Sequence, residues 1–308
     1  MQRGRVLCIG GATVDRTYRL AGPLRFDTSN PAEGRRGYGG VARNVAENLA
    51  RLGAAVGLIT AVGGDPSGRA LAAALASSGA DTRGVAEVPG ASTAEYAAIL
   101  TPEGDLTIGL ADMAILDTLT LAVLATHAPL IAAAEWVFAD CNLPAASLAA
   151  LAQRSFSGAS YRLAVDVVSV EKSARLPQCL DGIDLLVLNR AEAEAVLART
   201  GPISSSPEVD AVALCHAGCD AVVLTLGADG AVAASREGTV RLKAVPVRTV
   251  DVTGAGDSLV AATLYGLVAG ASLVDAVALG CRAAAHTVAH LGTVSPGLAA
   301  ALNLGAPS

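Results

Sequence analysis

Short apolar runs rich in β-branched residues alternate along the chain with longer Ala- and Leu-rich stretches of helical period. Strands that alternate with helices form a parallel sheet covered by helices on both faces. The runs are hydrophobic almost throughout, which is typical of parallel strands buried on both sides. We therefore predict an α/β fold with strands at residues 6–9, 56–62, 136–139, 163–168, 185–188 and 222–226, and helices at 41–52, 68–78, 143–153, 191–200 and 208–217.

Two segments, residues 12–38 and 92–112, break this alternation. In the second, the apolar run at 95–100 is followed by the turn sequence Pro-Glu-Gly-Asp at 102–105 and a return run. This pattern is typical of a β-hairpin. We expect the two segments to form a small accessory sheet over the main one, within a single domain spanning residues 1–308.

Composition excludes several classes of protein. The net charge of −6 and the 3% content of aromatic residues indicate no nucleic-acid surface. Residues 259–281 are long and apolar enough to suggest a membrane span, but Gly-Ala-Ser at 270–272 has the pattern of one helix ending and another beginning. The six cysteines form no Cys-x-x-Cys pair, and we find no export signal, so we expect a cytoplasmic protein with no membrane partner.

The motif most suited to chemistry is Asp-Val-Thr-Gly-Ala-Gly-Asp at residues 251–257, between an extended run at 245–250 and a helix. Backbone amides at a glycine-rich helix start form an anion site without a cation. Asp257, in the first turn, could accept a proton from an attacking hydroxyl. The alternative is a plain turn with an acid favoured by the helix dipole. The only lysines, Lys172 and Lys243, stand in no Walker loop.

Three further motifs each allow a structural or a ligand-binding interpretation. Gly39-Gly40 opens a helix on which Asn44 could bind sugar hydroxyls, or it is an ordinary helix entry. Asn189 and Glu192 form a helix capping box or an oxygen pair that orders water around Mg²⁺. The sequence from Thr225 through Gly227 to Gly230 predicts a strand, a tight turn and a second strand, where a nucleotide could bind.

Polar residues also stand where the predicted strands end, and ligands bind at that edge of open α/β sheets. A site at this edge is therefore expected. The four histidines lack metal-ligand spacing, so we interpret them as structural. The polar strand-end residues are Asp15, Asp140, Asn142, Asp166, Asn189 and Thr225.

Taken together and in this order, the four motifs resemble the ribokinase-like (PfkB) carbohydrate kinase family over nearly the whole chain. The resemblance implies a three-layer α/β/α fold with a β-sheet lid that pairs two subunits into a homodimer. It implies ATP and Mg²⁺ as cofactors, and K⁺ as a candidate near Asp251 and Thr253. The implied roles are Asp257 as catalytic base, an anion hole at Gly254, Ala255 and Gly256, water-linked Mg²⁺ at Asn189 and Glu192, ATP binding at Asn189, Thr225, Gly227 and Gly230, and acceptor binding at Asp15, Gly39, Gly40 and Asn44.

Several stretches are most similar to members that phosphorylate the 5′-hydroxyl of the nucleoside pseudouridine, although Val167 replaces the usual proline of that subgroup. This implies further acceptor contacts at Ser29, Asn30, Asp112, Asp166 and Lys172. The rivals are a kinase for ribose, another nucleoside or a sugar phosphate, and a non-catalytic binding protein. A sugar phosphate would need cations, for which the candidates are Arg16, Arg25, Arg35, Arg36 and Arg43, residues that we interpret as solvated surface.

Overall fold

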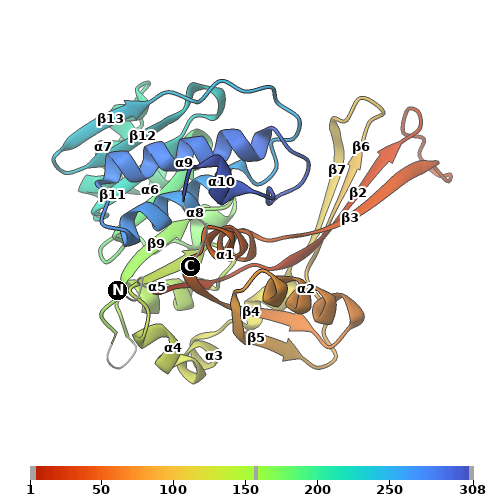
Figure 1. Cartoon of the computed structure of the whole chain (residues 1–308), viewed down its shortest axis with the longest axis horizontal. Helices are drawn as coiled ribbons and strands as arrows, with labels where there is room; N and C mark the ends of the chain where they lie inside the picture. Colours follow the sequence, from red (N-terminus) through yellow and green to blue (C-terminus); the bar gives the residue numbers. More distant parts are fainter. Residues whose placement is uncertain (1–4, 156–158, 305–308) are drawn as a thin grey trace.

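The computed structural model describes residues 5–155 and 159–304, and most of its strands belong to one sheet. The strands of this sheet are β1 (Arg5–Ile9), β4 (Ala55–Gly63), β5 (Asp81–Val88), β8 (Trp136–Asp140), β9 (Arg162–Asp166), β10 (Leu185–Asn189), β11 (Ala221–Thr225), β12 (Ala231–Ser235) and β13 (Gly238–Leu242). Their order is β13-β12-β11-β10-β9-β8-β1-β4-β5 (Figure 1). The seven strands from β11 to β5 are parallel, while β12 and β13 add an antiparallel edge. The predicted α/β fold is confirmed.

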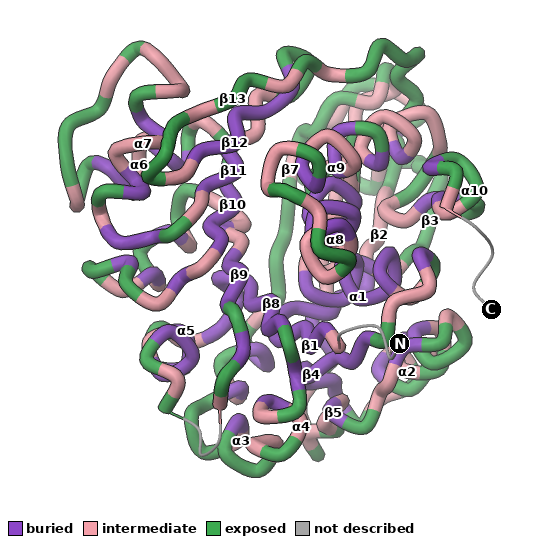
Figure 2. The backbone as a smooth tube through the Cα atoms, turned by 60° about the vertical axis from the view of Figure 1, so that its left-hand side comes forward, coloured by how far each residue is buried: buried purple, intermediate pink, exposed green. Residues whose placement is uncertain are grey.

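Helices cover both faces of the main sheet. They are α1 (Val41–Arg51), α2 (Pro66–Ser77), α3 (Leu121–Thr126), α4 (Ala128–Ala132), α5 (Ala145–Ala152), α6 (Arg190–Thr200), α7 (Pro207–His216), α8 (Ala255–Val268), α9 (Leu273–Val288) and α10 (Leu298–Ala301), with 3₁₀ turns η1 (Ala114–Thr118), η2 (Lys172–Arg175) and η3 (Gly227–Asp229). In β1, Val6 and Cys8 belong to the core cluster under α1, α2, α8 and α9, whereas Leu7 and Ile9 belong to the cluster on the other face, under η1 and α3 to α7. Figure 2 shows the central strands buried between these two helical layers.

The apolar stretch at 259–281 divides into two helices, as predicted. Helix α8 ends at Val268, and the Ser272 hydroxyl accepts a hydrogen bond from the Asp275 amide to cap α9. Within residues 5–155 and 159–304, no helix is long and apolar enough to cross a membrane.

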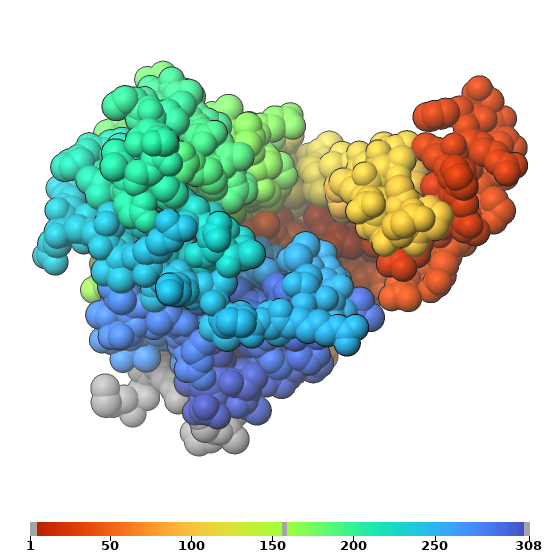
Figure 3. All heavy atoms as spheres, turned by 90° about the horizontal axis from the view of Figure 1, so that it is seen from above, coloured from red at the N-terminus to blue at the C-terminus, as the bar shows by residue number. Residues whose placement is uncertain are grey.

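A second sheet projects from the body as a lid (Figure 1). Its strands are β2 (Thr13–Leu20), β3 (Ala32–Gly39), β6 (Glu95–Leu100) and β7 (Leu106–Asp112), in the order β3-β2-β6-β7. The two segments that interrupt the βα rhythm therefore pair with each other, through the parallel strands β2 and β6. Figure 3 shows the molecule hollowed between this lid and the body.

Three local predictions need correction. The strand predicted at 163–168 ends at Asp166, because the Asp166 side chain accepts the Val168 amide and turns the chain. The run at 245–250, predicted as extended, belongs to no strand. Strand β5 and the segment from η1 to α4 were not predicted, because they lack strong periodicity.

Candidate active site

The lid joins the body at a buried carboxylate, Asp140, at the end of β8. Its Oδ2 accepts the amides of Gly11 and Ala42, each at 2.9 Å, and its Oδ1 accepts the Asn142 amide at 2.9 Å. Gly11 precedes β2 and Ala42 lies in the first turn of α1, so one side chain fixes the chain on both sides of the lid hairpin. A Cβ atom on Gly10 would collide with this carboxylate, which explains the glycine there.

Helix α8 begins at the glycine-rich motif. Gly254 is its N-cap in the left-handed region, with φ of 76°, and a Cβ there would collide with the Thr293 carbonyl oxygen. A Cβ on Gly256 would meet nothing within 4 Å. Gly256 is also exposed, so the backbone of this turn is accessible at the positive end of the helix, where anions bind favourably.

Asp257 lies in that first turn and contacts α1. The Asn44 Nδ2 atom donates a hydrogen bond of 2.7 Å to Asp257 Oδ2. The pKa of Asp257 is raised to about 6, chiefly by burial and also by the charges of Asp140 and Asp15, while the Asn44 hydrogen bond and Arg43 oppose the rise. A carboxylate with this pKa is suited to accept a proton near neutral pH.

Asp15 lies beside this pair, at the base of the lid. Its carboxylate accepts a hydrogen bond of 2.8 Å from the Thr13 hydroxyl, and it leaves no room for a Cβ on Gly39. Gly40, with φ of 92°, passes so close to the Gly11 carbonyl that only glycine fits. The structure therefore brings together the predicted acceptor residues Asp15, Gly39, Gly40 and Asn44 with Asp257.

Asp166 and Glu192 extend the acidic cluster along the sheet edge. Burial raises the pKa of Asp166 well above its ordinary value, and the charges of Asp257 and Glu192 raise it further. Burial also raises the pKa of Glu192. Among residues 5–155 and 159–304, no three acidic, histidine or cysteine side chains lie close enough together to hold a metal ion directly. The hard carboxylate oxygens of Asp166 and Glu192 therefore fit a Mg²⁺ ion held through water.

Asn189 and Glu192 form the capping box considered from the sequence. Asn189 Oδ1 accepts the Glu192 amide at 3.0 Å, and Glu192 Oε2 accepts the Asn189 amide at 2.8 Å. The cap uses one oxygen of Glu192. This oxygen, Oε2, is the one that accepts the backbone amide, so capping and water-mediated Mg²⁺ binding are compatible.

The predicted ATP residues lie on the body side of this edge. Asn189 and Thr225 are paired between β10 and β11. Together with Gly227 they line a cavity of about 570 Å³, to which Arg190 and Arg241 also contribute. Gly230 does not line this cavity; a Cβ there would collide with the Leu242 carbonyl oxygen, so its role is to close the turn.

Lys172 reaches the same edge from η2, where its Nζ donates to Asn142 Oδ1. Burial lowers the pKa of Lys172. Asn142 was noted in the sequence only as a polar strand end, yet it lies between Asp140 and this amine. On the other flank of the anion site, Asp251 accepts the amides of Thr253 at 2.9 Å and Gly292 at 3.1 Å, joining two loops.

Ser29, Asn30 and Asp112 are not brought to the acceptor residues. Ser29 and Asn30 lie in the loop that joins β2 to β3, where Asn30 Oδ1 accepts the Arg25 amide at 2.8 Å. Asp15 lies five residues before the end of β2, so this loop is roughly 17 Å farther along the strand.

Strand register places Asp112 on the face of the lid opposite to Asp15. Asp112 pairs with Glu95 and through it with Val14, whereas Asp15 pairs with Tyr96. Neighbouring residues in a strand point to opposite faces. The register therefore separates Asp112 from Asp15. The sequence analysis did not single out Tyr96, which shares the face of Asp15.

The arginines suggested as phosphate contacts are largely engaged elsewhere. Arg43 is only 4% exposed, so its interpretation as solvated surface was wrong. Arg16 pairs with Glu95 at 2.7 Å, and Arg36 donates to the Ser67 hydroxyl.

A β-sheet lid over the carboxyl edge of a mainly parallel sheet is the ribokinase-like fold. The carboxylate of Asp257, at a glycine-rich helix start, lies between the two. The model of the pfkB family carbohydrate kinases matches residues 3–300. The chain belongs to this PfkB family and is a kinase.

Individual relatives agree with this assignment. The chain is 32% identical to the pseudouridine kinase of Escherichia coli K12 over 290 residues, covering 92% of this chain and 91% of that one. A carbohydrate kinase from Agrobacterium tumefaciens is 32% identical with a TM-score of 0.80, covering 98% and 97% of the two chains. The ribokinase of Thermotoga maritima, 18% identical, shares the fold with a TM-score of 0.86 over 97% and 98% of the chains.

Proposed function

We propose that this kinase transfers the γ-phosphoryl group of ATP to the 5′-hydroxyl of pseudouridine. The observation that carries the reaction is the 2.7 Å hydrogen bond between Asn44 and Asp257 at the start of α8. It joins a group suited to sugar hydroxyls, a carboxylate with a pKa of about 6 and a helix N-terminus. The substrate rests on the 32% identity to the pseudouridine kinase, which extends over 92% of the chain.

In the proposed mechanism, Asp257 accepts the proton of the 5′-hydroxyl as its oxygen attacks the γ-phosphorus. Asp15 and Asn44 hold the ribose, with the bare backbone of Gly39 and Gly40 allowing close approach. The amides of residues 254–256 stabilise the negative charge on the transferred group. Catalysis of this kind depends mainly on positioning and electrostatics.

ATP would bind across the cavity lined by Asn189, Thr225 and Gly227. Bound Mg²⁺ would neutralise charge on the phosphate oxygens, and Glu192 with Asn189 would hold it through water. Asp166 adds a further carboxylate to this set. Asp251, with the carbonyl of Thr253, is proposed for K⁺.

The nucleoside base would lie against the lid face that carries Asp15 and Tyr96, with Lys172 and Asn142 facing it from the body. Pseudouridine differs from uridine in a free ring N–H beside the glycosidic carbon. An acceptor on the protein would pair with this N–H, and uridine would leave that acceptor unpaired. An unpaired buried polar group costs about 1–3 kcal/mol, which corresponds to roughly ten- to a hundredfold selectivity.

An acceptor panel tests the substrate. Purified protein with ATP and Mg²⁺ would be assayed for ADP release with pseudouridine, uridine, inosine, ribose and fructose 6-phosphate. We expect the highest kcat/KM for pseudouridine. A higher value for ribose or fructose 6-phosphate would overturn the substrate assignment, and calorimetric binding of ATP and nucleoside without ADP release would identify a non-catalytic binding protein.

A further inference from the structure

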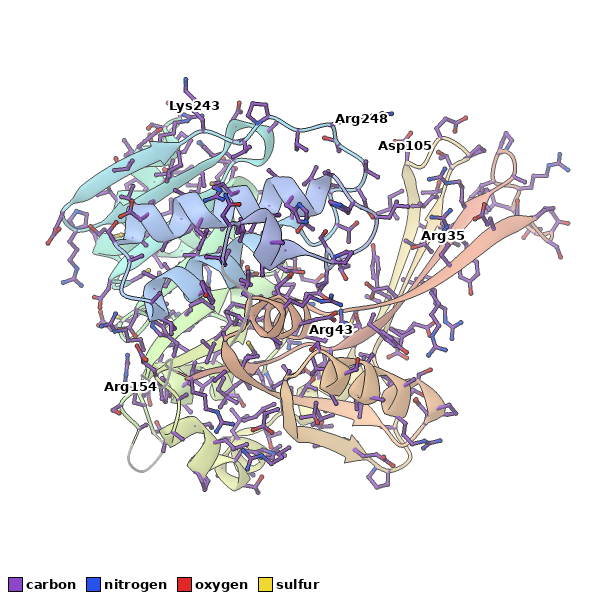
Figure 4. All side chains as sticks on the ribbon, viewed as in Figure 1. Arg35, Arg43, Asp105, Arg154, Lys243 and Arg248 are labelled. Atoms are coloured by element: carbon purple, nitrogen blue, oxygen red, sulfur yellow. The ribbon has the colours of Figure 1, made fainter. Side chains whose placement is uncertain are left out.

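Arg43 is a nearly buried arginine between the lid and the site. It lies on α1 where the lid strands leave the body (Figure 4), with only 4% of its surface exposed. A buried guanidinium is stable only when other groups compensate its charge and hydrogen bonds. The identity of its partners therefore indicates what this residue does.

The partners of Arg43 connect the lid to Asn44, the residue that donates a hydrogen bond to Asp257. Arg43 Nη1 donates to the Tyr38 carbonyl oxygen at 3.1 Å and to Asn44 Oδ1 at 2.9 Å. Its Nη2 donates to Glu47, and its guanidinium carbon lies 5.8 Å from the centre of the Tyr38 ring. Tyr38 is the next-to-last residue of β3, so Arg43 connects the end of the lid hairpin to the site.

The contact with Asn44 determines which way its amide points. An amide has an accepting oxygen and a donating nitrogen, whereas a guanidinium can only donate. Arg43 therefore selects the orientation in which Asn44 Oδ1 faces the guanidinium and Nδ2 faces Asp257. In the flipped orientation, an oxygen of Asn44 would face the Asp257 carboxylate and repel it.

We propose that Arg43 is a positioning residue that, through the Asn44 amide, holds the Asp257 carboxylate in the ionised, hydrogen-bonded state that accepts the hydroxyl proton. This inference rests on the proposed role of Asp257 as base. Arg43 itself need not touch the substrate.

The charges around Asp257 show why such a residue matters. Asp15 on β2 and Asp140 on β8 face Asp257, and Asp166 on β9 also interacts with it. Asp140 and Asp15 raise the pKa of Asp257, and the charge of Asp257 in turn raises the pKa of Asp166. Arg43 on α1 is the cation that opposes them. Its removal is therefore expected to raise the pKa of Asp257 and leave the base protonated at a higher pH.

Glu47 provides a matched control because it pairs with two arginines of α1. Arg43 and Arg51 both form i,i+4 ion pairs with Glu47. Arg51 lies one helical turn beyond Glu47, away from Asn44, and its side chain is 37% exposed. The hydrogen bonds of Arg51 go to Glu47 Oε1. Arg43→Met and Arg51→Met each break one ion pair with Glu47, but only the first removes the contact with Asn44.

The kinetic test compares the two variants over a range of pH. For Arg43→Met we expect the acid limb of kcat/KM to move up by at least one pH unit and kcat/KM at pH 6 to fall at least about fivefold. For Arg51→Met we expect the acid limb of kcat/KM to stay at the same pH as in the wild type. If Arg43→Met fails to fold, the double variant Arg43→Met/Glu47→Gln takes its place in the test. This variant removes both charges of the buried pair, so neither is left without a partner.

A second readout does not depend on turnover. The carboxyl ¹³C signal of Asp257 can be titrated in aspartate-labelled protein and assigned by its absence in Asp257→Asn. We expect its midpoint to rise by at least one unit in Arg43→Met and to stay unchanged in Arg51→Met. Equal midpoints in all three proteins would overturn the role of Arg43. A shifted midpoint in a protein whose wild type transfers no phosphate would support that role and refute the proposed function.

Discussion

At the scale of single residues, Asp257 determines how the proposed reaction responds to pH. Its carboxylate must be ionised to accept a proton, and its pKa is raised to about 6. We expect kcat/KM to be level above pH 7 and to fall tenfold per pH unit well below 6. Steady-state kinetics between pH 5 and 9 would measure this limb, and a profile that stays level down to pH 5 would exclude Asp257 as the base.

Individual residues differ in how far the sequence predicts them. The glycines at 39, 40 and 254 are identified by their motifs, and the structure shows close backbone approaches or a positive φ at each. The Asn44–Asp257 pair is different, because its members are 213 residues apart and only the fold joins them. In the sequence, Arg43 has no feature that separates it from a surface arginine of a helix, because only the fold shows that it is buried.

At the scale of elements, the turn after β9 carries backbone strain. Val168 has φ of 68°, and the Ser169 amide donates to the Val167 carbonyl at 2.8 Å, forming a γ-turn. Positive φ is a clear outlier for a β-branched residue, and such turns are rare and strained. The turn lies between Asp166 and Lys172, so the strain is located where the site needs a fixed geometry.

Substitution of Val168 by glycine should release this strain. Because glycine adopts positive φ without penalty, the released strain of about 1–2 kcal/mol should offset the loss of the partly buried Val168 side chain, so we expect Val168→Gly to leave the free energy of unfolding nearly unchanged. It should also raise KM for the acceptor, because the turn becomes more flexible. The control is Val170→Gly, at an exposed position of the same loop without positive φ, which should lower stability. Thermal denaturation would compare the stabilities of the two variants. An equal loss of stability in both would contradict the presence of strain at Val168.

The lid shows what an element prediction leaves open. The hairpin at 95–112 follows from its turn and its two apolar runs. Its register relative to β2 does not, because the parallel pairing of β2 with β6 joins segments about 80 residues apart. A shift of one residue reverses the faces. The contact of Asp112 with the acceptor was expected from the family resemblance alone, and the register places this residue on the face of the lid opposite to Asp15.

At the scale of the whole molecule, the lid is a single sheet whose face opposite to Asp15 carries an apolar patch beside the charged residues Arg16, Glu95 and Asp112. Tyr18, Ile99 and Ile108 are paired on the face opposite to Asp15, and Leu110 lies on that face next to Ile108. Tyr18 is 38% and Leu110 is 58% exposed. We propose that a second copy of the chain covers this face, giving a homodimer. Such a dimer, or closure of the lid, would be needed for Ser29 and Asn30 to reach a base.

Analytical ultracentrifugation tests the dimer. We expect the wild type to sediment with twice the mass of the chain, and Leu110→Asp to sediment as a monomer because a carboxylate would be buried in the interface. Leu121→Asp is the control, at an exposed apolar position on α3. A monomeric wild type would exclude the lid interface, and a dimeric Leu110→Asp variant would place the interface elsewhere.

The architecture is more predictable than the assembly of the site. Continuous apolar strands and amphipathic helices such as α1 predict a parallel sheet with two helical layers, because burial sets the pattern. They do not predict the strand order or the antiparallel β12 and β13. These depend on packing between distant segments, and the same packing brings Asp15, Asn44 and Asp257 together.

The most direct test of the central claim is product formation by wild type and Asp257→Asn. Each would be incubated with ATP, Mg²⁺ and pseudouridine, and the product would be identified by ³¹P and ¹H NMR, with ATP affinity measured in parallel. We expect the wild type to form pseudouridine 5′-phosphate and the variant to be slower by about 10²–10⁴ with ATP affinity largely retained. Near-wild-type turnover in Asp257→Asn would contradict the role of Asp257 as the base. The absence of a 5′-phosphorylated nucleoside with the wild type would contradict the proposed reaction.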